Sequence, residues 1–289
     1  MIISRGERVF QWVNVAFLVL VAVVALFPVL YLVSMSLTPL EVLYKYGGFR
    51  VIPPQVTLEA YKQILSTPLI PRAFMNSVII TAVGTTINLA LTIITAYPLS
   101  KRRLPGRSVL TLLVTFTMMF SGGLIPSYLL VKNLGLRDTY WAVILPGAIA
   151  TYNLLVMKGF FESLPEELNE AARIDGASEW RVLTSVTLPL SKPVIATLGL
   201  FYGVGHWNGF FDAMMYISDS RLLPLQVVLR NILMDAMRNT EVTPDAIQVM
   251  PGETLKMATV VIALIPVLLA YPWVQKHFTK GVLIGSIKG

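Results

Sequence analysis

Six runs without a charged residue divide this 289-residue chain, and they restrict what it can fold into. The runs are 19 to 32 residues long and lie at 9–40, 73–100, 108–131, 139–157, 193–211 and 257–275. A helix of about 20 apolar residues crosses the hydrocarbon core of a bilayer, and lipid-embedded backbone groups must be hydrogen-bonded within the segment. The runs therefore predict an all-α fold, a polytopic membrane helical bundle with about six transmembrane helices.

The composition agrees with a membrane protein. Hydrophobic residues make up 55% of the chain and charged residues 13%, and the mean hydropathy is +0.69, which is too apolar for an ordinary soluble domain. The net charge of +7 does not indicate nucleic-acid binding, because the basic residues lie between the apolar runs and form no dense patch. The chain contains no cysteine, which excludes disulfides and thiolate chemistry.

The placement of basic residues predicts the orientation. Lys101, Arg102, Arg103 and Arg107 lie close together between the second and third runs, and short loops rich in lysine and arginine stay in the cytoplasm. Six spans place both ends of the chain on one side, so both termini are expected to be cytoplasmic. The first run is longer than the core of a signal peptide and is expected to be retained as a span.

These considerations give predicted boundaries. A cytoplasmic N-terminus is expected at 1–8, a transmembrane domain at 9–275 and a cytoplasmic C-terminal tail at 276–289. The spans are expected at about 11–34, 74–99, 108–131, 139–160, 191–212 and 256–275, with a cytoplasmic loop at 163–190.

The loop at 163–190 is charged, and its sequence predicts a helix, a turn and a second helix. Ser163 followed by Glu166 matches a capping box, and Pro165 suits a first helical turn, so the first helix is expected to begin near Leu164.

The predicted turn is at Asp175-Gly176, because glycine tolerates the left-handed conformation that commonly closes a helix. Ser178 can cap a second helix that runs toward Leu188-Pro189. One side of the first helix presents mainly small residues, which would allow another protein to approach closely: Leu168, Ala171, Ala172 and Asp175. An amphipathic helix pair that only links two spans is the alternative interpretation.

Several residues of this loop, at fixed spacing, resemble the EAA loop of permease subunits of ATP-binding-cassette importers. In that family the loop forms a cytoplasmic coupling helix that sits in a cleft on the ATPase subunit. The residues that carry the resemblance, and therefore the implied contact with the ATPase, are Glu170, Ala171, Ala172, Asp175, Gly176, Ala177, Leu188 and Pro189, followed by Pro193.

Other segments resemble the carbohydrate branch of these permeases. They are Asn76-Ser77, 96–100, 105–107, 135–139 and Leu145-Pro146. The glycine-containing C-terminus is similar to the tail of maltose-type permeases, which reaches into the paired ATPase subunits. This resemblance implies a C-terminal ATPase contact through Gly285, Lys288 and Gly289, with a frayed terminus as the alternative.

The fifth run carries the candidate residues for a substrate pathway: Tyr202, His206, Trp207, Asn208 and Asp212. Polar groups at a membrane boundary usually face the bundle interior or a watery cavity. Aromatic rings beside hydroxyl, amide and carboxylate groups suit sugars. The alternative is an interfacial aromatic belt in which Tyr202 and His206 bond to neighbouring helices.

The chain has no Walker-type motif and only two histidines, His206 and His277, which are predicted on opposite sides of the membrane. We therefore expect no enzyme activity, no metal site and no cofactor bound by this chain. The resemblance implies that partner ATPase subunits bind ATP and Mg. An integral-membrane enzyme would need a second convergent set of catalytic groups, which the sequence does not supply.

The resemblance implies a multi-pass permease subunit in a prokaryotic cell membrane, forming half of a pathway for a carbohydrate. The implied partners are a second homologous permease subunit, two ATP-binding subunits, an extracellular solute-binding protein and the lipid bilayer. An oligosaccharide is the expected substrate, with a uronate-containing saccharide as a refinement from the likeness of 122–146 to importers of such polymers. The alternatives are an importer of amino acids, peptides or ions in the same superfamily, and an ATP-independent channel or carrier.

Overall fold

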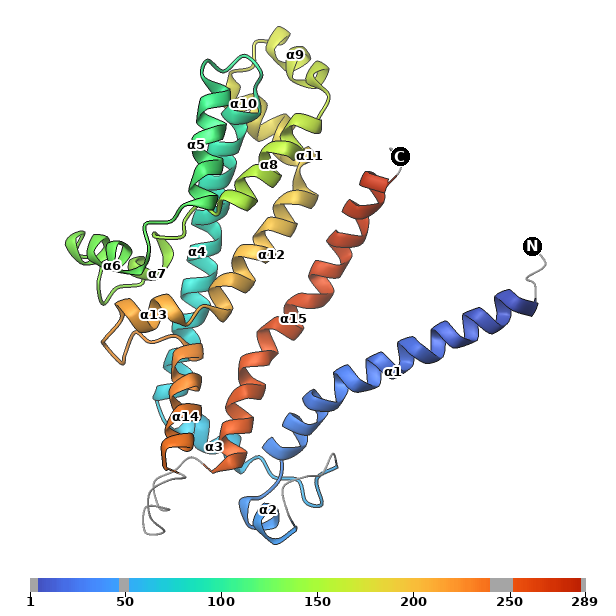
Figure 1. The fold of residues 1–289 in the computed structure, drawn as a ribbon, viewed down its shortest axis with the longest axis vertical. Helices are drawn as coiled ribbons and strands as arrows, with labels where there is room; N and C mark the ends of the chain where they lie inside the picture. The colour runs from blue at the N-terminus through green and yellow to red at the C-terminus, as the bar shows by residue number, and fades with distance from the viewer. Residues whose placement is uncertain (1–4, 47–51, 240–251, 287–289) are drawn as a thin grey trace. The chain divides into compact units, whose positions relative to one another are not determined.

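The computed structural model describes residues 5–46, 52–239 and 252–286, and every regular element in these ranges is a helix. The all-α prediction is therefore confirmed. In chain order the elements are α1 (Arg5–Ser36), α2 (Leu40–Tyr46), α3 (Glu59–Ser66), α4 (Leu69–Ser100), α5 (Arg107–Met119), α6 (Leu124–Asn133), α7 (Trp141–Ile144), α8 (Thr151–Ser163), α9 (Glu166–Ile174), α10 (Glu179–Val182), the π-helix η1 (Leu183–Thr187), α11 (Leu188–Leu190), α12 (Lys192–Asn208), α13 (Phe211–Tyr216), α14 (Leu225–Asn239) and α15 (Glu253–Ser286) (Figure 1).

The chain divides into two compact units. The first contains Met1–Pro71 and Leu229–Ile265, and the second contains Arg72–Val228 and Pro266–Gly289. The second unit therefore holds the charged loop and the fifth predicted span.

In the first unit, α1 is an apolar helix whose side chains are exposed along most of its length. Its C-terminal end is held by the segment that leads into α3. The Thr57 backbone N–H donates to the Leu37 carbonyl at 2.8 Å, and the hydroxyls of Ser36 and Tyr61 are 2.7 Å apart. A long apolar helix with exposed side chains is suited to contact with lipid or with another transmembrane helix.

In the second unit, the C-terminal part of α4 packs against later helices. Its last turns form a core with α8, η1 and the start of α12. The buried members of this core are Ala96, Tyr97, Leu99, Leu154, Met157, Phe161, Leu183, Val194 and Leu198. Figure 1 shows α9 and α10 at one end of this unit and α6, α7 and α13 toward the other.

Two helices among the described residues are long and apolar enough to cross a membrane alone, Gly6–Ser36 and Leu69–Ser100. They correspond to the first and second predicted spans. The number rises to four if each of two bent pairs counts as one span. The pairs are α5 with α6, and the helical run Glu179–Leu190 with α12, whose axes change direction by 111° and 83°.

The third predicted span, 108–131, is therefore divided between α5 and α6 and is not one continuous helix. The chain leaves α5 after Met119, and Gly123 has a φ of 85°, which a residue with a side chain rarely adopts. The fourth predicted span, 139–160, is also interrupted, between Ile144 and Thr151. Pro146 lies in this interruption and cannot supply a helical N–H.

The sixth predicted span lies within α15, but this helix continues through Ser286. The predicted tail at 276–289 therefore begins as helix. Gly285 belongs to α15, whereas Lys288 and Gly289 lie outside the described residues.

Asn76 connects α4 to two distant segments of the second unit. Its side-chain amide donates to the carbonyls of Arg221 and Leu223 at 2.9 and 3.0 Å, and its oxygen accepts from the Tyr140 hydroxyl at 2.8 Å. Asn76 is 4% exposed, and buried amides need such partners. One side chain thus fixes the segments before α7 and after α13 to the same helix.

Candidate functional site

The charged loop folds as helix, turn and helix, as the sequence predicts. The Ala177 N–H donates to the Ala172 carbonyl, and the Gly176 N–H donates to the Arg173 carbonyl, each at 3.0 Å. These two bonds form a Schellman motif, which closes a helix through a left-handed residue. Gly176 is that residue, with a φ of 78°.

The start of the loop differs from the prediction. Ser163 does not cap the first helix; it is the last residue of α8, and its hydroxyl donates to the Phe160 carbonyl at 2.7 Å. The helix begins at Glu166 and not near Leu164. The physical reason is Pro165, which disfavours helical geometry in the preceding residue, so Leu164 is extended and separates α8 from α9.

The predicted cap of the second helix is confirmed, because the Ser178 hydroxyl accepts from the Arg181 N–H at 3.4 Å. The helical run then widens into a π-turn, in which the Leu188 N–H bonds to the Leu183 carbonyl. Pro189 follows directly, has no N–H and crowds the carbonyl four residues before it. A widened turn relieves this crowding.

Most of the residues that resemble a coupling helix lie at the surface. Glu170, Ala171, Asp175, Gly176 and Pro189 are exposed, while Ala172, Ala177 and Leu188 are half-buried. Two large apolar side chains that the sequence analysis did not select are also exposed, Ile174 at 86% and Trp180 at 65%. Large apolar residues in a charged loop are the sequence signal that would have identified them as candidates for contact with another protein.

Arg173 joins the two arms of the loop. Its Nε donates to Glu179 at 2.8 Å and its NH1 group donates to Glu166 at 3.2 Å. The hydrogen bond from Arg173 lowers the pKa of Glu179, and the same bond contributes most to raising the pKa of Arg173. The Tyr97 hydroxyl also donates to Glu179, at 2.9 Å, so the loop is attached directly to α4.

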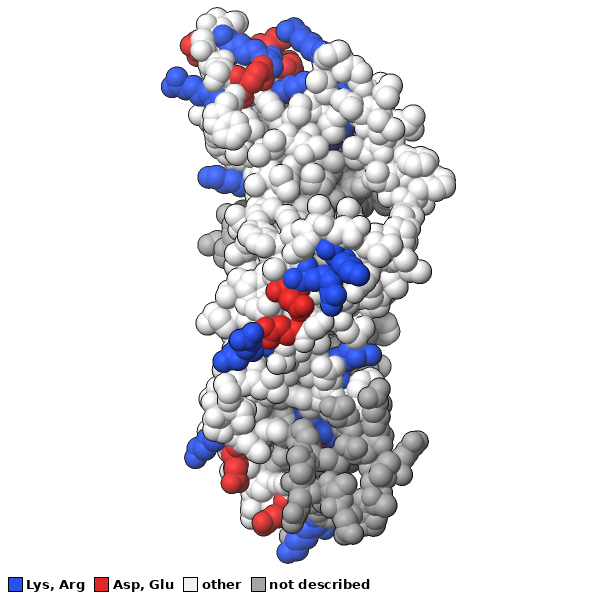
Figure 2. All heavy atoms as spheres, turned by 90° about the vertical axis from the view of Figure 1, so that its left-hand side faces the viewer, with Lys and Arg blue, Asp and Glu red and all other residues white. Residues whose placement is uncertain are grey.

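Charged side chains of both signs gather at the end of the second unit formed by α9 (Figure 2). Additional ion pairs there connect the loop to the α4–α5 connection, with Lys101 Nζ 3.8 Å from Glu166 and Arg103 3.9 Å from Glu170. The loop is thus attached to the end of α4 and to the connection that follows it.

Tyr202 and His206 of the fifth span face α4. The Tyr202 hydroxyl is 2.7 Å from the Thr92 hydroxyl and accepts from the Ala150 N–H at 3.1 Å. The Asn88 amide nitrogen is 3.0 Å from His206 Nε2. These contacts agree with the alternative interpretation of Tyr202 and His206, in which they join neighbouring helices.

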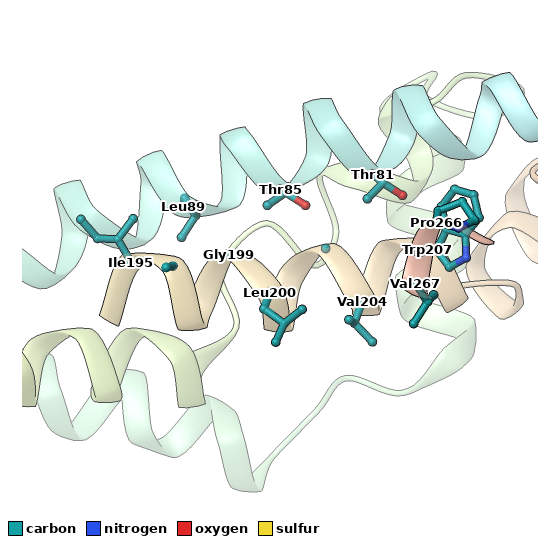
Figure 3. A pocket seen from close by; sticks show the side chains of 12 residues that line it. Thr81, Thr85, Leu89, Ile195, Gly199, Leu200, Val204, Trp207, Pro266 and Val267 are labelled. Atoms are coloured by element: carbon teal, nitrogen blue, oxygen red, sulfur yellow. The ribbon is translucent and has the colours of Figure 1, made fainter. Parts of the chain in front are cut away.

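The close approach of α12 to α4 depends on Gly84. A Cβ atom on this residue would lie 2.5 Å from His206 Nε2. Beside this contact is a largely apolar cavity of about 390 Å³ between α4 and α12, which Pro266 and Val267 of α15 also line. Figure 3 shows Thr81 and Thr85 of α4 on one side of the cavity and Gly199, Leu200 and Val204 of α12 on the other.

The remaining candidates of the fifth span separate into two groups. Trp207 is 5% exposed and packs edge-to-face on Phe74, with ring centroids 5.7 Å apart. Asn208 and Asp212 are exposed and lie beyond the Tyr202–His206 contacts, away from the charged loop. The five residues therefore do not form one cluster: Tyr202 and Trp207 are buried, His206 is half-buried, and Asn208 and Asp212 are exposed.

The partners on α4 were missed by the sequence analysis. Gly84, Asn88 and Thr92 form a stripe of small and polar residues at helical spacing within an apolar span. Such residues in a transmembrane helix commonly mark the contact with another helix. The stripe is visible in the sequence, but its partner on α12 is not.

Comparisons with known proteins agree on one family. The profile of the family described as "Binding-protein-dependent transport system inner membrane component" matches residues 2–284. Protein LplC of Bacillus subtilis (strain 168) is 50% identical over 290 residues, covering 99% of this chain and 97% of the relative. The polygalacturonan/rhamnogalacturonan transport system permease protein YtcP of the same organism is 43% identical, covering 98% of this chain and 99% of the relative.

A solved structure has the same fold. It is a chain of a bacterial ABC transporter involved in the import of the acidic polysaccharide alginate. The two chains are 33% identical, the TM-score is 0.85, and the match covers 95% of this chain and 98% of the other.

Proposed function

Because the chain belongs to the family of binding-protein-dependent transport system inner membrane components, we propose that it is a permease subunit of an ATP-binding-cassette importer for acidic oligosaccharides. The observation that carries this proposal is the structural likeness to the alginate importer, which extends over 95% of the chain at 33% identity. The relative YtcP, named for polygalacturonan and rhamnogalacturonan transport, supports the same class of substrate.

In this proposal the chain forms half of a membrane pathway, and a second homologous permease forms the other half. Two cytoplasmic ATP-binding subunits bind ATP and Mg and supply the energy, and an extracellular solute-binding protein delivers the saccharide. The chain itself is not an enzyme and has no cofactor. Both of its termini are cytoplasmic, and Gly285, Lys288 and Gly289 add a contact with the ATPases.

The coupling loop of this proposal comprises α9 to α11. Its exposed residues, including Ala171 and Gly176 together with Ile174 and Trp180, dock on an ATPase subunit. The contacts of Arg173 with both arms make the loop move as one piece, and the Tyr97–Glu179 hydrogen bond passes that movement to α4. ATP-driven closure then rocks the membrane helices between inward-open and outward-open states.

In the pathway, we assign saccharide contacts to Asn208 and Asp212, because both are exposed. Their amide and carboxylate oxygens accept hydrogen bonds from sugar hydroxyls. Tyr202 and His206 hold α12 against α4 and act as positioning residues. Trp207 adds a further contact between α12 and α4 by packing on Phe74.

The test is ATP-dependent uptake into vesicles that contain the complete complex and its binding protein. Labelled uronate oligosaccharides are compared with neutral oligosaccharides of equal length and with amino acids and peptides. We expect uptake to be selective for uronates. Equal or better uptake of the neutral saccharides would contradict the acidic substrate, and uptake of amino acids or peptides alone would contradict a carbohydrate importer.

Two variants test the pathway residues in the same assay. Asn208→Ala removes one hydrogen bond to the saccharide and should lower uptake at limiting substrate about 2- to 10-fold. Asn133→Ala, at an exposed asparagine on α6, is the matched control and should transport normally. Asp212→Asn removes a charge that repels a uronate, so it should impair neutral saccharides more than acidic ones. Normal uptake by Asn208→Ala and by Asp212→Asn would exclude both residues from the pathway.

A further inference from the structure

A basic cavity of about 550 Å³ lies where α4 ends and α5 begins, beside the charged loop. Five cationic side chains line it, Lys101, Arg102, Arg103, Arg107 and Arg173. Two carboxylates, those of Glu162 and Glu166, share the lining. The cavity therefore has an excess of positive charge, and all of its lining residues belong to the second unit.

The two carboxylates are already occupied by particular cations. Arg107 pairs with Glu162 and donates from Nε to the Leu99 carbonyl at 2.9 Å. Glu166 accepts from Arg173 and from Asn169 at 3.2 and 3.0 Å.

Three of the cations have no carboxylate within hydrogen-bond distance, and the nearest carboxylate to Arg103 is that of Glu170 at 3.9 Å. Lys101 Nζ is 3.8 Å from Glu166, and its side chain is 18% exposed. Burial lowers the pKa of Lys101, so its charge is poorly solvated. Arg102 makes no ion pair with any residue that the structure describes. These cations are available to an anion in the cavity.

The position of the cavity relates it to the membrane. The apolar helix α4 ends at Ser100, and α5 begins at Arg107. From Arg107 onward α5 exposes apolar side chains in successive turns, including Val109 at 60%, Leu113 at 57% and Phe116 at 53%. The cavity therefore lies at the boundary where apolar helical surface meets a charged connection, which is the level of phospholipid headgroups.

We propose that this cavity binds the phosphate group of an anionic phospholipid in the inner leaflet. Guanidinium groups bind phosphate oxygens through charge-assisted hydrogen bonds, and basic pockets between transmembrane helices on the cytoplasmic side suit anionic headgroups. The exposed apolar face of α5 offers a surface for the acyl chains. The assignment to the inner leaflet rests on the orientation in the proposed function.

Binding of the lipid would also affect how the coupling loop is held. Arg173 and Glu166 line the cavity and at the same time hold α9 to α10 and to the end of α4. A phosphate group beside them would stabilise the positive charge of Arg173 and Lys101. The bound lipid would thus help to hold the loop in position.

The experiment measures the phospholipid retained by the complete complex. The complex is reconstituted in nanodiscs of phosphatidylcholine and phosphatidylglycerol in phosphate-free buffer, and native mass spectrometry counts the lipid that stays bound. We expect selective retention of phosphatidylglycerol. Arg102→Gln should weaken it about fivefold, since one basic residue near a lipid surface contributes about 1 kcal/mol, and Arg102→Lys should retain most of the binding.

The controls distinguish this cavity from exposed basic residues elsewhere on the chain and from a site for free phosphate. Lys132→Gln removes one exposed positive charge on α6, outside the cavity, and should not change retention. Unchanged retention in Arg102→Gln, or an equal loss in Lys132→Gln, would overturn the proposal. A second arm adds inorganic phosphate; displacement of phosphatidylglycerol at millimolar concentrations would assign the cavity to free phosphate and overturn the lipid assignment.

The readout is independent of transport. A complex that retains phosphatidylglycerol through Arg102 but imports no saccharide would contradict the proposed function and leave the lipid site intact. A complex that imports uronates without selective lipid retention would contradict the lipid site alone.

Discussion

Replacing Gly84 of α4 with alanine would displace the side chain of His206, which extends from α12 and contacts α4. The added Cβ atom would lie 2.5 Å from Nε2, 2.8 Å from Cε1 and 2.9 Å from Cδ2 of the imidazole. These distances are too short for non-bonded atoms, so the ring must shift. The shift would break the 3.0 Å contact between His206 and Asn88.

The magnitude follows from three contributions. Overpacking costs about 1–3 kcal/mol, and the lower end of this range applies because the clashing atoms are the tip of the His206 side chain, beside the cavity of about 390 Å³. The lost interhelical hydrogen bond costs about 0.6 kcal/mol, and alanine in place of glycine inside a helix returns about 0.5–1 kcal/mol, so these two nearly cancel. We therefore expect Gly84→Ala to destabilise the helix pair by about 1 kcal/mol, mainly through the steric contact.

The assay is thermal unfolding of the purified complex, with single and double variants in a cycle. His206→Ala removes the imidazole, so Gly84→Ala added to it should be neutral or stabilising. Gly205→Ala is the matched control, because no atom lies within 4 Å of its Cβ position. The reasoning would be refuted if Gly84→Ala were as stable as Gly205→Ala, or if it cost the same with and without His206.

Three further predictions concern the loop and the other end of α4. Gly176→Ala places a side chain in a left-handed conformation without any steric neighbour, so it should cost about 1–2 kcal/mol through the backbone alone; ATPase activity stimulated by the binding protein should fall, and Gly176→Asn should lose less. The pairing of Glu179 with Arg173 contributes fully above the unfolded-state pKa of about 4.3 and is lost as the pH falls through the lower folded-state pKa. The unfolding temperature should therefore fall as the pH is lowered below about 4.3. If a Glu179→Gln variant lost stability at acidic pH just as the wild type does, that result would contradict the pairing. Asn76→Ala removes the side-chain partner of the Arg221 and Leu223 carbonyls and of the Tyr140 hydroxyl, and it should cost about 1–3 kcal/mol; limited proteolysis should then cut near 221, and wild-type resistance would argue against this role.

The helical character of the chain could be predicted because it depends on local properties. Charge-free runs, the glycine that closes α9 and the serine that caps α10 each act within a few residues of sequence. The capping box failed for a local reason as well, since Pro165 extends Leu164 and leaves Ser163 on α8.

The broken spans mark the limit of hydropathy. The mean hydropathy of a window of about 20 residues measures polarity but not the direction of the helix axis. The segment 108–131 therefore resembles one helix, although the axes of α5 and α6 differ by 111°. Ser121, Gly122 and Gly123 permit this bend, but the same residues would also be tolerated in a straight transmembrane helix.

By itself, the sequence determined that the chain is an apolar helical protein with a charged helix–turn–helix before its fifth apolar run. Only the tertiary structure decided which face of that run is buried, because Tyr202 and His206 have partners on α4, Thr92 and Asn88, more than 100 residues earlier in the chain. It also decided that the basic residues after α4 surround a cavity with Arg173. The physical reason is that packing and charge excess depend on distances in space, which residue spacing along one helix does not specify.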